Sequence, residues 1–271
     1  VSSGGIQNVY GGTANGTAIQ AGGIQNVQGG TVNHVTVKSA GIQNTYAGTA
    51  VGTTVESGGL VSVRADGAAE NMTIQYGGSA VIAAGVLAGA IRLAGYLELQ
   101  SGADSSAAYV TLDMTGRRSA DGVMVNRVDL LANGLTQIQN AAGLGRGSYL
   151  LAGGAASYTA ALNCTGVEAG SAFTQIALAG RYSGAASGNN RSVLQKDSGG
   201  NLVLFVHERY VLLGNGNMEA IADDDSYTDM RSGEASGGYY AELRAGQNYD
   251  NLIFMGRSNA DVTGTLELKI T

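Results

Sequence analysis

The sequence contains no proline, no tryptophan and only one cysteine in 271 residues. A single cysteine, Cys164, excludes an intrachain disulfide, and no Cys/His spacing typical of a zinc site is present. Charged residues make up 13% of the chain and the net charge is −6, which argues against nucleic-acid binding because phosphate neutralisation requires clustered Lys and Arg. No apolar run reaches the ~18 residues that a membrane-spanning helix needs, so we expect no membrane insertion by this chain.

Glycine is abundant, with 44 residues, and much of it belongs to a repeated motif. The motif Gly-Gly-Ile-Gln-Asn-Val at residues 4–9 returns at 22–27, then as Ala-Gly-Ile-Gln-Asn-Thr at 40–45, and more weakly at 58–63. A fixed period of this kind, here about 18 residues, is typical of a solenoid, in which each repeat buries its apolar face against its neighbours.

The side chains within each repeat favour strands over helices. Short alternating runs of Val, Ile, Thr and Leu stand between glycine-rich turns, and helical spacing is not sustained anywhere in residues 1–112. An ankyrin or tetratricopeptide array is therefore excluded. We predict an all-β fold, a right-handed parallel β-helix of ~18-residue coils with two or three short strands per coil and coils stacked roughly 4.8 Å apart.

Aligning the repeats gives three columns that we predict to face the interior, because side chains two apart on a strand share a face. The first column is Ile19, Val37, Val55, Ile74, Ile91 and Val110. The second is Gln7, Gln25, Gln43, Val61, Ala80 and Leu97. The third is Val9, Val27, Thr45, Val63, Ile82 and Leu99.

The glutamines of the second column occupy positions that later coils fill with Val61 and Leu97, which indicates an interior location. Stacked glutamines can form an amide ladder between coils. The predicted ladder consists of Gln7, Gln25 and Gln43. In the alternative, the glutamines face outward and the isoleucines before them face inward. Glu98 argues against this alternative, because it lies between Leu97 and Leu99 and must face water.

The doublet Gly-Gly-Ile-Gln-Asn-Val-x-Gly-Gly-Thr-Ala-x-x-Thr-x-Ile resembles the repeat of AIDA-like autotransporter adhesins of Gram-negative bacteria. The resemblance is close over residues 1–76 and looser over 77–112, and residues 147–206 are similar to the segment that follows the repeats in that family. It implies a right-handed β-helix in a secreted passenger domain at the cell surface. The chain begins in mid-repeat, so we expect a fragment of a longer precursor whose export signal and translocating β-barrel lie elsewhere.

Three regions follow from where the periodicity fades. Residues 1–112 carry the β-helix repeats, and 113–206 are expected to form irregular coils followed by a β-rich cap, which a solenoid needs at its end. Residues 207–271 have strand-like ends around a polar middle, and we interpret them as a small β-module or the start of the next passenger segment.

The function expected from the resemblance is adhesion or aggregation by contact along the rod, without catalysis. The partners would be copies of the chain on other cells, or glycans or proteins on a host surface. A structural stalk that displays another domain is the first alternative. A β-helix lyase or glycosidase is the second, although such enzymes need acids that converge on one face and the acids of residues 1–112 are scattered. Asp113 near Arg117 is the closest approach to such a group.

No cofactor or metal site is expected. The acidic run 223–229 lacks the glycine and distal glutamate of an EF-hand loop, and we interpret it as a solvated loop. The doublet Arg117-Arg118 is likewise interpreted as part of a solvated loop. The glycine-rich stretch 143–147 lacks the Lys-Ser/Thr of a phosphate-binding loop.

Sugar modification is a further implication of the resemblance, because AIDA-like repeats resemble substrates of bacterial heptosyltransferases that modify Ser and Thr hydroxyls. The candidate sites recur once per repeat after a glycine corner, at Thr13, Thr31 and Thr49. A modified column would coat one edge of the rod and hinder unwanted strand pairing. In the alternative, these hydroxyls satisfy backbone groups at the corners through local hydrogen bonds.

Overall fold

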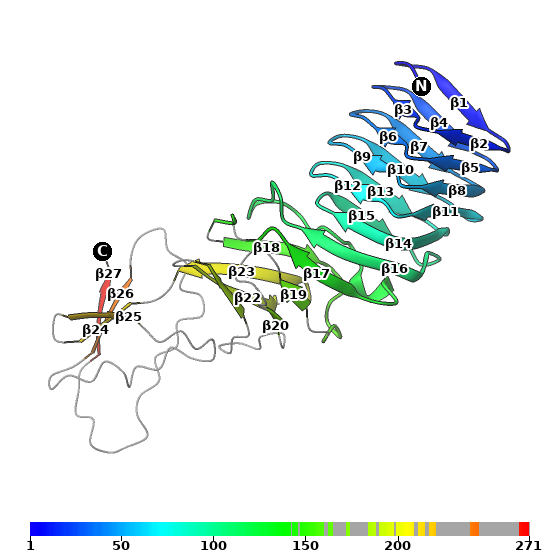
Figure 1. Cartoon of the computed structure of the whole chain (residues 1–271). Helices are drawn as coiled ribbons and strands as arrows, with labels where there is room; N and C mark the ends of the chain where they lie inside the picture. The colour runs from blue at the N-terminus through cyan, green and yellow to red at the C-terminus, as the bar shows by residue number, and fades with distance from the viewer. Residues whose placement is uncertain are drawn as a thin grey trace.

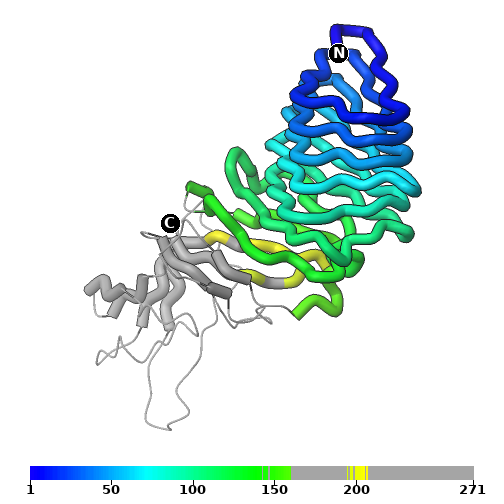
Figure 2. Tube along the Cα trace, turned by 45° about the vertical axis from the view of Figure 1, so that its right-hand side comes forward, coloured from blue at the N-terminus to red at the C-terminus, as the bar shows by residue number. Residues whose placement is uncertain are grey.

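The computed structural model describes residues 1–141, 143–145, 147–159, 162–164, 172–173, 184–187, 190–197, 199–208, 211–214, 217–220, 239–243 and 266–270. Within these residues the regular elements are β-strands and one short 3-10 helix, η1 (Val128–Leu130). The N-terminal part is a stack of coils along one axis, seen in Figure 1 and, turned, in Figure 2. The all-β solenoid predicted from the repeats is therefore confirmed.

One strand of each of the first six coils lies in a six-stranded parallel sheet. Its strands, in spatial order, are β1 (Ile6–Val9), β4 (Ile24–Val27), β7 (Ile42–Thr45), β10 (Leu60–Val63), β13 (Ser79–Ile82) and β15 (Tyr96–Leu99). Identical motif positions pair directly, as Gln7 does with Gln25 and Gln25 with Gln43.

The other two strands of each of the first four coils form two rows of a thirteen-stranded sheet. One row is β2 (Thr13–Asn15), β5 (Thr31–Asn33), β8 (Gly48–Val51) and β11 (Gly67–Glu70). The other is β3 (Ala18–Ile19), β6 (Thr36–Val37), β9 (Thr54–Val55) and β12 (Thr73–Ile74). Both rows pair with the long β14 (Val86–Leu93), which is followed by β16 (Asp104–Asp113), β17 (Leu135–Gln139), β19 (Leu162–Cys164) and β20 (Ala172–Phe173).

A tight turn separates the two rows at one fixed position of each of the first four coils. The residues there have left-handed backbone, with φ of 64° at Gly16, 53° at His34, 68° at Gly52 and 54° at Asn71. Glycine adopts this conformation without the Cβ clash that other residues meet, and Asn tolerates it better than most. His34 is exposed, as its alignment with Gly16 and Gly52 predicts.

The second and third predicted columns are confirmed in register, and in burial except at Gln7 of the first coil, which is half-buried. Val61, Ala80 and Leu97 stack in the second column, and Val63, Ile82 and Leu99 in the third, all essentially without solvent contact. Their partners in the earlier coils are in register with them. The interior is therefore a set of side chains that stack on their own counterparts.

The first column is correct for four coils and wrong at the fifth. Ile74 pairs with Leu93, not with Ile91, and Ile91 pairs with Val110. The reason is an extra residue in β14, because the step from Thr73 to its partner Arg92 is one residue longer than the step from Glu70 to Ala88. Ile91 and Leu93 are both buried and two positions apart, so the sequence pattern alone does not distinguish them.

The stack ends through longer coils and a change of strand direction. Leu112 pairs with Ile138 and Ile138 with Cys164, so these coils contain more residues than the repeats before them. Val125 bridges Leu97 to Ala152 in parallel fashion and thus continues the line of the six-stranded sheet.

Beyond Val125, an antiparallel sheet has the order β18 (Gly147–Ala152), β23 (Leu202–Glu208), β22 (Asn190–Lys196) and β21 (Gly184–Ser187). The turn between β22 and β23 is held by Asp197, whose carboxylate accepts hydrogen bonds from the backbone N–H of Gly199 and of Asn201. A separate four-stranded sheet contains β24 (Val211–Gly214), β25 (Asn217–Ala220), β26 (Tyr239–Leu243) and β27 (Leu266–Ile270).

Thr45 offers a test of the core register. It is the only hydroxyl of its column, it is fully buried, and within the described residues its Oγ1 has no hydrogen-bond partner. Thr45→Val should therefore raise the free energy of unfolding by about 1 kcal/mol, since a buried unsatisfied group costs roughly 1–3 kcal/mol. Urea unfolding measures the change.

The matched control is Thr53, which is equally buried but donates its hydroxyl to Gln43 Oε1 at 3.2 Å. Thr53→Val should lower the free energy of unfolding by about 1 kcal/mol, because it removes a hydrogen bond from a buried amide. If both valines shift stability in the same direction, the assignment of the two hydroxyls is wrong.

Candidate functional site: the outer faces of the coils

The interior glutamines determine which side chains each coil presents to the solvent. Gln25 donates from Nε2 to Gln7 Oε1 at 2.8 Å, and Gln43 donates to Gln25 Oε1 at 3.0 Å. Gln25 and Gln43 have no solvent exposure. The structure therefore contains the hydrogen-bonded series that the column pattern predicts, and it places the alternating positions of the same strands outside.

The ladder makes each glutamine depend on its neighbours, which gives a second test. Gln25→Leu would leave the buried Nε2 of Gln43 without its acceptor, so we expect a loss of roughly 1–3 kcal/mol in the free energy of unfolding. Replacing all three glutamines by leucine, together with Thr53→Val because the Thr53 hydroxyl donates to Gln43 Oε1, leaves no unpaired buried group of the ladder and should cost less than the single change. Urea unfolding of the single and multiple variants measures these free energies. If the losses of the separate substitutions simply add, the ladder does not couple the glutamines.

The outer face of the six-stranded sheet carries two ranks of recurring residues. One is an aliphatic rank made of Ile6, Ile24, Ile42 and Leu60. The other is an asparagine ladder, in which Asn26 donates to Asn8 and Asn44 to Asn26, each at 2.9 Å. We call these two ranks together the Ile/Asn face. Neither rank carries a charge over the first three coils.

An exposed corner borders the Ile/Asn face. Tyr10 is 70% exposed and Tyr46 40% exposed, and the guanidinium of Arg64 lies 5.7 Å from the centre of the Tyr46 ring. Arg64 occupies the same position one coil further on, so the cation–π contact runs from coil to coil. Sequence reasoning missed this corner and the asparagine ladder, although the recurrence of Asn8, Asn26 and Asn44 once per repeat was available to it.

The threonines predicted as modification sites lie on a different outer face. Thr13, Thr31 and Thr49 pair with one another in β2, β5 and β8. Thr13 is exposed and the other two are half-buried. Within the described residues none of the three hydroxyls has a hydrogen-bond partner, so local corner bonds do not occupy them. Asn33 donates to Asn15 at 2.7 Å on the same face.

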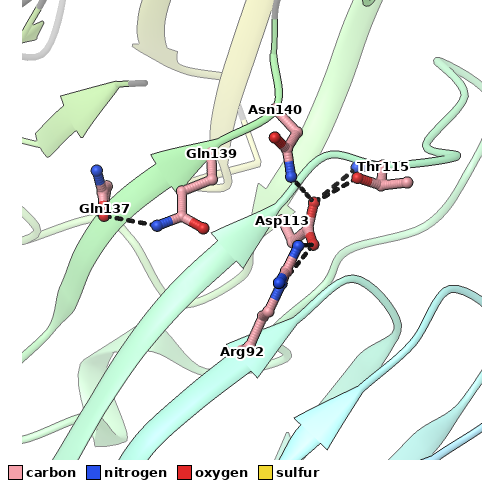
Figure 3. Close-up of polar contacts among 6 residues, drawn as sticks. All are labelled: Arg92, Asp113, Thr115, Gln137, Gln139 and Asn140. Atoms are coloured by element: carbon pink, nitrogen blue, oxygen red, sulfur yellow. Dashed lines mark hydrogen bonds and ion pairs between the residues drawn. The ribbon is translucent and has the colours of Figure 1, made fainter. Parts of the chain in front are cut away.

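The most connected polar group surrounds Asp113 and is shown in Figure 3. Arg92, in the preceding coil, donates to Asp113 Oδ2 from Nε at 2.7 Å and from Nη2 at 2.6 Å. Thr115 and Asn140 donate to Oδ1, both at 2.7 Å. The carboxylate therefore joins three successive turns of the stack, from β14 to the end of β17.

The hydrogen bonds to Asp113 keep it ionised despite its burial. Burial alone would raise the pKa of this carboxyl, but the hydrogen bonds from Asn140, Thr115 and Arg92 outweigh it and lower the pKa to about 2. A carboxylate with this pKa and saturated acceptors is a structural anion rather than a proton donor.

Asp113 and Arg117 are close in the sequence, but they do not form an ion pair in the structure. Arg92 is the partner of Asp113, because the coil stacking brings β14 beside β16. Arg117 instead lies near Asp121 and Leu150, with only 6% of its side chain exposed. The interpretation of the doublet as part of a solvated loop therefore holds for the exposed Arg118 but not for Arg117.

Asp113 predicts a specific acid sensitivity. Its folded pKa of about 2 lies below the ~3.9 of an unfolded aspartate, so its stabilising contribution is complete above about pH 5 and is lost as the pH falls from about 4 to about 2. Asp113→Asn should lower stability at pH 7 and flatten this acid limb. Thermal unfolding of the wild type and of Asp113→Asn, measured between pH 2 and pH 7, tests this prediction. If the loss of stability between about pH 4 and about pH 2 is the same in both proteins, the assignment is refuted.

The remaining candidates for chemistry give no further site in the described part of the chain. There, no group of three or more His, Cys, Asp or Glu side chains is placed to hold a metal ion, and no helix is long and apolar enough to cross a membrane. The acidic run 223–229 lies outside the described residues.

Comparisons with protein families, curated proteins and solved structures found no match to this chain.

Proposed function

We propose that this chain is an extracellular adhesion or aggregation module, displayed at the surface of a Gram-negative bacterium as part of an autotransporter passenger. The observation that carries the proposal is the Ile/Asn face, where the same two residues recur in register on successive coils. The resemblance of the repeat to AIDA-like adhesins supports the assignment to a passenger.

The chemistry of the Ile/Asn face fits contact with an extended partner. The asparagine amides are already ordered by bonds of 2.9 Å to each other, so little side-chain entropy remains to be lost on binding. Each coil adds one more copy of the same weak contact, and many such contacts on one rod act together as avidity. A second copy of the chain presents the same ranks and is the partner that we favour.

Cell aggregation with matched charge variants tests this function. Asn26→Glu with Asn44→Glu puts two negative charges on the Ile/Asn face, and facing copies would then repel one another. We expect cells that display this variant to lose aggregation by at least about tenfold, the change that ~1.4 kcal/mol of repulsion produces. Settling of cell suspensions measures it.

The control carries the same charges on another outer face. Thr36→Glu with Thr54→Glu adds two charges to neighbouring coils at half-buried outward positions of β6 and β9, and aggregation should persist. Antibody staining confirms equal display. Aggregation that survives both variants and deletion of residues 1–112 would contradict the proposal and favour a passive stalk.

We also propose sugar modification of Thr13, Thr31 and Thr49, because their hydroxyls are unoccupied within the described structure and aligned along one face. In a host that carries a suitable transferase, the intact mass of the purified chain should exceed that of the bare sequence by whole sugar units. The Thr13→Val, Thr31→Val, Thr49→Val variant should lose that excess. A mass equal to the bare sequence in such a host would contradict the proposal.

A further inference from the structure

The segment between β16 and the Val125 bridge departs from the geometry of the other coils. In the first coil, the corner that leads back to the six-stranded sheet has four residues, between Ile19 and Ile24. The same corner has only two residues between β14 and β15, whereas eleven residues separate Asp113 from Val125. We call residues 114–124 the long corner. Its extra length has to be accommodated against the side of the stack.

The long corner folds back toward an earlier corner. Tyr76, between β12 and β13, donates its hydroxyl to Asp121 Oδ1 at 3.3 Å. Gly116 lies beside Tyr76, so closely that a Cβ on Gly116 would be 3.3 Å from Cγ of the tyrosine. The very short corner between β14 and β15 lies between these two and leaves room for the contact.

Arg117 connects the same segment to the antiparallel sheet. Its guanidinium donates to the carbonyl oxygens of Gly122 and of Leu150, the latter at 3.3 Å and within β18. Asp121 Oδ2 lies 3.9 Å from Arg117 Nε and supplies the opposite charge. Burial lowers the pKa of Arg117, and the neighbouring Asp121 carboxylate opposes that effect.

The long corner is also ordered by its own backbone. Arg117 N–H donates to Met114 O at 3.1 Å, and Asp121 N–H donates to Arg118 O at 3.1 Å. Arg118 N–H donates to the Asp121 carboxylate at 2.9 Å. Residues 114–121 therefore form successive closed turns, which can transmit a contact from one end to the other.

We propose that the long corner is a clasp that couples the corner at Tyr76 to strand β18, so that these two parts of the molecule open together. Arg117 holds the clasp to β18 through its hydrogen bond to the carbonyl oxygen of Leu150. In a simple solenoid each coil contacts only its neighbours, and the end of the array can open independently of earlier coils. The clasp contacts a corner two turns upstream and a strand downstream, and it removes that independence. This role does not depend on the proposed function in adhesion.

Native-state hydrogen exchange of the full chain, followed by mass spectrometry at increasing urea, tests the clasp. In the wild type, residues 71–80 and residues 147–152 should become exchange-competent with the same urea dependence. Arg117→Met keeps much of the side-chain volume but removes the donors and the charge. It should accelerate exchange in 147–152 by about 10- to 100-fold, the effect of losing a buried charged hydrogen bond, and separate it from exchange in 71–80.

Arg118→Met is the matched control, because Arg118 is exposed and contributes its backbone N–H, but no side-chain hydrogen bond, within the described residues. Its exchange should equal that of the wild type. Tyr76→Phe removes only the hydroxyl and does not touch β18, yet it should accelerate exchange in 147–152 by about fivefold through the clasp. The proposal is overturned if the two regions already exchange independently in the wild type, or if Tyr76→Phe leaves 147–152 unchanged.

Discussion

The solenoid depends on the pairing of each coil with its counterpart in the next. Each inward position must accept a side chain that lies directly on its own equivalent, about 4.8 Å away. Aliphatic residues meet this condition by packing, as the buried stack of Val61, Ala80 and Leu97 shows. Glutamine meets it by donating an amide proton to the glutamine of the previous coil. A polar residue that does neither, such as Thr45, remains unsatisfied.

The same pairing also makes the outward-facing side chains recur from coil to coil. Because inward and outward positions alternate, a motif that keeps its interior in register also places Ile and Asn in ranks on the outside. A surface built in this way gains area by adding coils rather than by shaping a pocket. Adhesion or aggregation by distributed contact is the proposed use of that surface, whereas the best-connected polar group, around Asp113, serves to join successive turns.

The sequence was sufficient to predict the solenoid, two interior columns and the glutamine series, because in-register stacking restricts which residues can recur. It failed at Ile91, since one extra residue in β14 makes Leu93 the partner of Ile74, and the equally apolar Ile91 lies only two positions away. The partner of Asp113 could not be found until that register was known. The burial of Arg117 had no local signal, because it arises from Leu150 and from the long corner itself.

In-register stacking is tested most directly by distances along the outer face. Asn8, Ser62, Val81 and Glu98 occupy one outward column in coils one, four, five and six. Spin labels at Asn8 and at each of the other three, in a Cys164→Ser background, should give separations that grow by about 4.8 Å per coil, to about 24 Å for Glu98. Distances that do not grow in equal steps with coil number would contradict the account.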